Sequence, residues 1–127
     1  MKTQITSFLF FLTLAFTVNA QDPYLQKDME YLEPVVDSIA QLYNPRLVMS
    51  AEQYVLFKKK LMEFEIRREN VRKMDAPIKK KLSMLKALSK IETREMDDIL
   101  TRFQHKAYKR VKKEIQPVAI VVGNTNE

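Results

Sequence analysis

Side chains that commonly carry out chemistry are scarce in this sequence of 127 residues. It has one histidine, His105, no cysteine and one glycine, which excludes a catalytic cysteine and a glycine-rich phosphate loop. Asp97 and Asp98 precede His105, but two carboxylates and one imidazole without further ligands make a poor metal site. We therefore expect no enzyme, no catalytic residue, no metal and no cofactor, and we interpret His105 as a solvated helix residue.

Two segments repeat one pattern: an apolar residue, a hydroxyl residue, two further residues and a glutamine. They are Met49-Ser50-Ala51-Glu52-Gln53 and Leu100-Thr101-Arg102-Phe103-Gln104. This spacing suits a capping box, in which the hydroxyl accepts from the N–H three residues later and the glutamine side chain reaches back to the cap. The same spacing occurs at Ser38 with Gln41 and at Ser89 with Glu92, inside expected helices. The two copies stand out because each opens an amphipathic segment rich in aromatic residues and lysine.

A band of basic side chains is a second candidate site. It occupies one expected helix and the start of the next: Lys58, Lys59, Lys60, Arg67, Arg68, Arg72, Lys73, Lys79, Lys80 and Lys81. Positive charge around apolar stripes attracts acidic segments over a distance and adds apolar contact at short range. We expect this band to hold unfolded or envelope proteins loosely. The alternative is that these residues only solvate helix faces.

The elements that must position these residues are helices. One glycine and no tryptophan favour long helices over a turn-rich β-sandwich, and the apolar spacing predicts an all-α fold of about four helices in a small bundle or curved hairpin. We expect helices at 22–32 and 35–43, at 51–74, at 78–99 and at 102–115. The first two are one kinked helix or two pieces around Pro34, and Asn44-Pro45 stops the second. Asp75 is expected to cap the helix from 78, and Pro117 to end the last one.

The two ends of the chain carry their own signals. Residues 1–20 have the parts of a cleavable secretory signal: Lys2, the apolar run 8–18 and the exit Val18-Asn19-Ala20. That run is short for a membrane helix, which needs about twenty residues, so we expect cleavage after Ala20 and no stable membrane insertion. We expect one helical domain at 21–122, with 118–122 as an extended arm or as a strand paired in a partner, and a disordered tail at 123–127.

Charge is unevenly distributed along the chain. Residues 21–53 hold six acidic and two basic side chains, whereas residues 54–127 hold ten acidic and nineteen basic ones. A basic chain often binds nucleic acid, but an exported one seldom meets it, so we expect no nucleic-acid partner. Without cysteines, stability must come from helix packing or from association, and a homodimer would bury amphipathic stripes that a small monomer leaves open.

The pattern Leu-Thr-x-x-Gln, complete at Leu100 to Gln104 and varied at Met49 to Gln53, resembles that of the LTxxQ-motif family of periplasmic proteins, the Spy/CpxP-like group. The resemblance covers Met49 to Ile115. It implies a thin, curved helical protein, often a homodimer, that acts as an ATP-independent chaperone or as an adaptor of an envelope-stress sensor. The first motif has Met-Ser in place of Leu-Thr, and the motifs lie closer together than in the family, so this chain resembles a short, divergent member.

These observations lead to two hypotheses. The first is a periplasmic or secreted helical binding protein, chaperone-like or a stress adaptor, with unfolded or envelope proteins as partners. The alternative is a structural or interaction subunit that binds one dedicated envelope partner.

Overall fold

A computed structural model describes residues 29–118. The predicted signal at 1–20, the start of the first expected helix and residues 119–127 lie outside the described residues. By its contacts the chain divides after Glu30, and the α-helices belong to the unit Tyr31–Glu127. The elements are η1 (Glu30–Leu32), α2 (Glu33–Leu47), α3 (Ala51–Lys73), α4 (Ile78–Glu95), η2 (Met96–Asp98) and α5 (Arg102–Ile115). The predicted all-α fold with four helices is confirmed for the described part, which contains no strand.

Helix α2 ends later than the sequence predicts. Pro34 lies in its first turn, where the missing N–H of proline leaves no bond unmade. Pro45 was expected to stop the helix, yet α2 continues to Leu47, which is buried. A proline in the last turn removes a single backbone bond, and burial of Leu47 offsets that loss. The helix stops at Val48, which adopts a left-handed φ of 51° and donates its N–H to the carbonyl of Asn44 at 2.8 Å.

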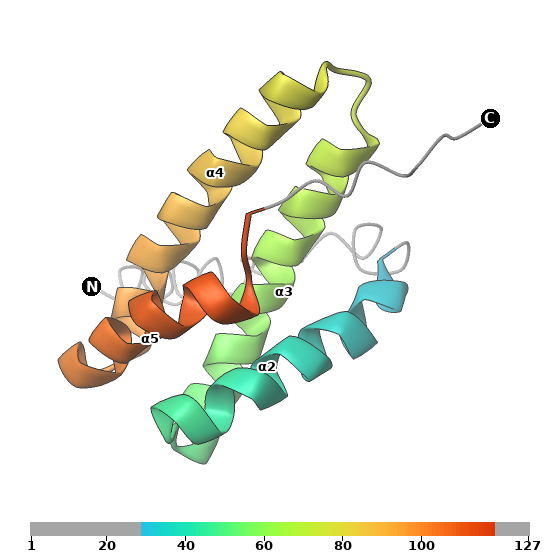
Figure 1. Ribbon diagram of the computed structural model, residues 1–127. Coiled ribbons are helices and arrows are strands. Elements are labelled where there is room, and N and C mark those ends of the chain that lie inside the picture. Colours follow the sequence, from blue (N-terminus) through green and yellow to red (C-terminus); the bar gives the residue numbers. More distant parts are fainter. Residues whose placement is uncertain (1–28, 119–127) are drawn as a thin grey trace, which may run out of the picture. The chain divides into compact units, whose positions relative to one another are not determined.

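Helices α3 and α4 run side by side in opposite directions, joined by residues 74–77 (Figure 1). Asp75, the expected cap of α4, does not cap it: the N-cap position is Pro77, and no side chain there accepts from the first turn. Lys81 donates across the turn to the carbonyl of Arg72 at 2.8 Å, which ties the two helix ends together. Toward its end α4 gives way to the 3-10 turn η2 at Met96, so the expected helix 78–99 is shorter than predicted.

The core lies where α2, α3 and α5 meet. It consists of Val36, Ala40, Tyr43, Leu47, Phe57, Leu61, Met96, Leu100, Tyr108 and Val111. Three aromatic rings form its centre: Tyr43 and Tyr108 each contact Phe57, at centroid distances of 5.2 and 5.9 Å, and lie 5.4 Å from one another. The edge-on contacts add about 0.5–1.5 kcal/mol each beyond area burial. The Tyr43 hydroxyl donates to Oε1 of Gln116 at 2.7 Å and so joins α2 to the residue that follows α5.

No helix within residues 29–118 has the length and apolar character needed to cross a lipid bilayer.

Candidate functional site

Both motif segments form the capping boxes that their spacing predicts. At the start of α3, the Ser50 hydroxyl accepts from the Gln53 N–H at 3.1 Å, and Oε1 of Gln53 accepts from the Ser50 N–H at 3.0 Å. At the start of α5, the Thr101 hydroxyl accepts from the Gln104 N–H at 3.3 Å, and Oε1 of Gln104 accepts from the Thr101 N–H at 2.9 Å. Each box satisfies backbone donors that a helix start otherwise leaves unpaired.

The two capping glutamines bind each other, and we call Gln53 and Gln104 the glutamine pair. Nε2 of Gln53 donates to Oε1 of Gln104 at 2.7 Å, and Nε2 of Gln104 donates to Oε1 of Gln53 at 3.1 Å. The same amides reach carbonyls of the preceding segments: Gln53 donates to Ile99 O at 3.2 Å, and Gln104 donates to Leu47 O at 3.2 Å and to Val48 O at 3.3 Å. The glutamine pair therefore connects the starts of α3 and α5 with the two segments that precede these helices.

The likeness of the two helix starts extends into the core. Seven residues after each hydroxyl comes a fully buried aromatic residue, Phe57 in α3 and Tyr108 in α5, and these are two of the three central rings. The apolar residue before each hydroxyl also packs inward: Leu100 is buried, and Met49 is partly buried against the core. This arrangement orients the starts of α3 and α5 toward the core.

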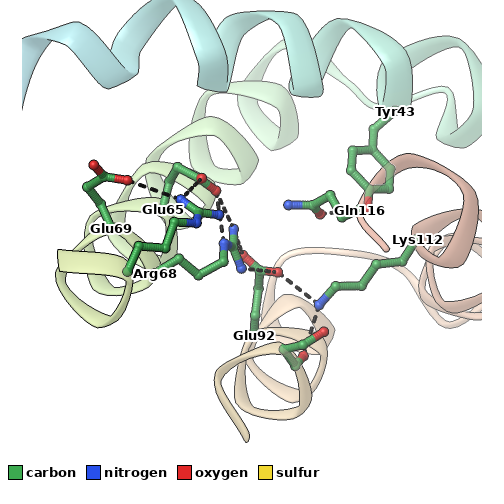
Figure 2. A network of polar contacts seen from close by, with 9 residues as sticks. Tyr43, Glu65, Arg68, Glu69, Glu92, Lys112 and Gln116 are labelled. Atoms are coloured by element: carbon green, nitrogen blue, oxygen red, sulfur yellow. Dashed lines mark hydrogen bonds and ion pairs between the residues drawn. The ribbon is translucent and has the colours of Figure 1, made fainter. Parts of the chain in front are cut away.

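Four ionisable side chains from three helices form a second polar centre, which we call the buried charge cluster: Glu65 and Arg68 of α3, Glu92 of α4 and Lys112 of α5 (Figure 2). Arg68 binds Glu92 through two parallel hydrogen bonds of 3.1 and 3.0 Å and donates from Nε to Glu65 at 2.9 Å. Nζ of Lys112 lies 2.8 Å from Oε1 of Glu92, an oxygen that also accepts from Arg68. The cluster thus joins α3, α4 and α5 through a single carboxylate.

Charges in the cluster balance, with two acids and two bases. Burial alone lowers the pKa of Arg68, but the charge and hydrogen bonds of Glu92 and Glu65 outweigh burial and raise it. Burial lowers the pKa of Lys112, and Glu92 offsets only part of that effect. Lys112 is also satisfied by the Ser89 carbonyl at 2.9 Å. Every charge therefore has a partner of opposite sign, which a buried ion requires.

Arg68 does not belong to the basic surface on which the sequence pattern placed it, because it is buried in this cluster. Five other members of the basic band pair with acids, and of these five Lys58 and Lys60 are only partly exposed. Their acidic partners are Asp37 for Lys58, Glu63 for Lys60 and Arg67, Glu65 and Glu69 for Arg72, and Glu69 for Lys73. Lys59, Lys79 and Lys80 have no acidic partner within residues 29–118. Much of the charge predicted to attract partners is thus already neutralised within the fold.

His105 is not solvated, contrary to the sequence interpretation. Its side chain is 15% exposed and stacks on Tyr108 at 6.0 Å. Nε2 donates to the Thr93 carbonyl at 2.6 Å, and Nδ1 lies 3.4 Å from the carboxylate of Asp97. Its role is to hold α5 against α4. Among the residues that the structure describes, no group of three or more His, Asp or Glu side chains is placed to bind a metal.

Sequence reasoning missed a basic groove between α4 and α5, with a volume of about 750 Å³, which we call the α5 groove. It is lined by Ser89, Thr93, Lys106, Lys109, Arg110, Lys112, Lys113, Gln116, Pro117 and Val118. A smaller cavity of about 170 Å³ lies beside it, against Arg68 and Leu85. The basic content of residues 106–113 was visible in the sequence, but only folding shows that no acid lines the groove beside them.

Comparison with family models, with curated proteins and with solved structures finds no match for this chain.

Proposed function

We propose that this protein is an exported helical binding protein of the periplasm that acts without ATP, as a chaperone or as an adaptor in an envelope-stress response. Two features support this proposal. The first is the resemblance of the two motif segments to the LTxxQ-motif family. The second is that the glutamine pair brings these segments together as a scaffold, so both motifs serve one structural purpose.

The observation that carries the proposal is the exposure of large apolar side chains next to the capping boxes. Phe103 is 86% exposed and follows Thr101 by two residues, and Val48 is 79% exposed and precedes Ser50 by two. Val55 and Leu56 are also exposed in the second turn of α3. A rigid scaffold with apolar side chains held in water suits weak, reversible contact with unfolded chains, which also expose apolar groups.

An aggregation assay tests the proposal. The purified protein is added without ATP to a chemically denatured substrate, and light scattering follows aggregation at low and high salt. We expect suppression that weakens in high salt and falls further in Phe103→Ser, because that substitution removes the most exposed apolar group. Ile78→Ser is the matched control, since Ile78 is also exposed but opens α4, far along the chain from both motifs. The absence of suppression at every stoichiometry would overturn the proposal.

A second candidate is a structural subunit with one dedicated envelope partner. The observation that favours it is rigidity, since the glutamine pair and the buried charge cluster fix all of α3, α4 and α5 in one arrangement. A fixed surface suits a single partner better than many. Pull-down from envelope extracts that returns one stoichiometric protein would support this candidate, and light scattering on the purified protein tests whether it forms a homodimer.

A further inference from the structure

Basic residues without acidic partners remain on α4 and α5, and four of those on α5 line one groove. Lys106, Lys109, Arg110 and Lys113 are exposed, line the α5 groove and take part in no ion pair within the described helices. Their positions follow the steps i, i+3, i+4 and i+7, so they form one continuous stripe along α5. Four unpaired basic side chains therefore line one concave surface.

We propose that the α5 groove is a binding site for acidic peptide segments in an extended conformation. The inference rests on the proposed function, because it names the class of client segment that binds in the α5 groove.

Charge complementarity is the first argument. No carboxylate lines the groove, although the chain has 16 acidic residues. The acid at the end of α5, Glu114, pairs with Arg46 of α2 at 3.3 Å and does not line it. Lys112 at the groove is neutralised by Glu92, so four uncompensated charges remain for a ligand. Such a field raises the rate of encounter with anionic segments and weakens with salt.

The spacing of the charges is the second argument. Positions four apart on a helix are separated by about 6 Å along its axis, and alternate residues of an extended chain by about 6.6 Å. Lys106 with Arg110 and Lys109 with Lys113 therefore match carboxylates carried on every second residue of an extended segment. Pro117 and Val118 add an apolar part to the lining of the groove.

The shape of the site distinguishes this ligand from an anionic membrane. A bilayer is planar on this scale, whereas the groove lies between two helices and includes the buried Lys112 in its lining. A single extended chain can enter such a hollow. The neighbouring cavity of about 170 Å³ is a weaker candidate, because its charged residues Glu65, Arg68 and Lys112 already satisfy one another.

The test measures binding of a fluorescein-labelled peptide of alternating glutamate and serine by fluorescence anisotropy, at low and high salt. A peptide of alternating glutamine and serine is the uncharged control. The charge-reversal variant Lys109→Glu/Lys113→Glu is compared with Lys79→Glu/Lys80→Glu, which changes net charge equally at exposed, unpaired lysines outside the groove. Circular dichroism checks helicity, and Lys109→Gln/Lys113→Gln replaces the first variant if that variant loses it.

We expect the native chain to bind the acidic peptide, the groove variant to lose at least about tenfold in affinity and the control variant to change by less than about twofold. Equal losses in the two variants would mean that net charge alone attracts the peptide, and would overturn the inference. Binding to vesicles with anionic lipid but not to the acidic peptide would also overturn it.

The aggregation assay separates this inference from the proposed function. If the native chain and the groove variant suppress aggregation equally, and the peptide does not bind, the groove inference fails while the chaperone proposal stands. If the native chain suppresses no aggregation but binds the peptide through the groove, the chaperone proposal fails while the groove site stands.

Discussion

Two polar centres hold α5 in place, and they differ in the charge of their side chains and in the partners that satisfy them. The glutamine pair, in the first turn of α5, is neutral, and each amide is satisfied by its own helix start, by the opposite amide and by nearby carbonyls. The buried charge cluster, two turns further along at Lys112, consists of ions that are satisfied mainly by one another across three helices. Only the capping bonds of the first centre form within one helix start, whereas the second centre needs all three helices to assemble.

This difference predicts that substituting one residue of each centre should lower stability by different amounts. A buried amide that loses its partner leaves donors and acceptors that cost about 1–3 kcal/mol, whereas a buried charge that loses its partner costs more. Replacing a whole buried ion network with apolar groups is often neutral, so the cluster contributes more to a unique arrangement than to net stability. The following substitutions test this contrast, in order of expected effect.

Arg68→Met should have the largest effect. It removes the charge that binds both Glu92 and Glu65, and we expect the free energy of unfolding to fall by about 3–5 kcal/mol. Urea unfolding followed by circular dichroism measures it. Arg67→Met is the matched control on the adjacent, exposed position, where the pair with Glu63 contributes less than about 1 kcal/mol. Equal effects in the two variants would mean that the cluster is not a distinct centre.

Gln53→Leu should cost less, about 2–3 kcal/mol, because it removes the glutamine half of one capping box and leaves the amide of Gln104 without its partner. Gln41→Leu is the control, since Gln41 has the same spacing from a serine but is exposed inside α2. A double-mutant cycle with Gln104→Leu should give a coupling energy of about 0.5–3 kcal/mol. Additive losses would show that the two boxes act independently.

Alkaline pH should affect stability through two tyrosines near the buried charge cluster, whereas the glutamine pair does not titrate. Burial, and then the charge of Glu92, raise the pKa of both Tyr43 and Tyr108. Above about pH 10 the unfolded chain releases these protons while the folded chain keeps them, so stability falls as pH rises, by up to about 1.4 kcal/mol per pH unit for each tyrosine. Lys112, whose pKa burial lowers, acts in the opposite sense just below its ordinary pKa.

Comparison of variants isolates the tyrosine effect. The buried hydroxyl of Tyr108 lies near Thr93 and completes no hydrogen bond within residues 29–118, so Tyr108→Phe should be nearly neutral at pH 7. The variant should nevertheless flatten the alkaline loss by about 1.4 kcal/mol per pH unit. Tyr43→Phe should flatten it equally but cost about 0.5–1.5 kcal/mol at pH 7, because it loses the bond to Gln116. Unfolding at a series of pH values checks both, and an unchanged slope would contradict this explanation.

Lys58→Ala should have the smallest effect. Lys58 pairs with Asp37 at the surface, and the hydrogen bond to Asp37 raises its pKa, but exposed pairs contribute only about 0–1 kcal/mol. Half a molar of added salt should remove most of that difference between variant and native chain. If the free energy of unfolding falls by more than about 1 kcal/mol and the loss persists in salt, this pair would behave like a buried ion pair, contrary to the prediction.

The sequence predicted the helices and the capping boxes well, because both depend on neighbours within a few residues. The start of α3 after Ser50 and the start of α5 after Thr101 lie where the pattern placed them. The pairing of Gln53 with Gln104 could not be predicted, since it depends on how helices 51 residues apart come together. Pro45 was wrongly taken as a stop, because the sequence does not show how deeply Leu47 is buried.

The charge cluster left a partial signal in the sequence. The sequence pattern placed Arg68 in the basic band, but Arg68 is buried at an inward-facing position of α3. Glu92 and Lys112 likewise stand at inward-facing positions of their helices, so α4 and α5 each carry one ion toward the core, and α3 carries two. Which ion meets which follows from tertiary packing alone. The same limit explains why the α5 groove was missed: unpaired charge can be recognised only when every acid has been placed.

The bond from Tyr43 to Gln116 has a consequence for the order of folding. It joins residues 73 positions apart and closes a core whose third aromatic ring, Tyr108, comes from the last helix. Helices α2, α3 and α4 can form in a growing chain, but their shared core stays open until α5 has been synthesised. A chain cut before α5 would expose Tyr43 and Phe57 to water, and its collapse into aggregates would compete with folding.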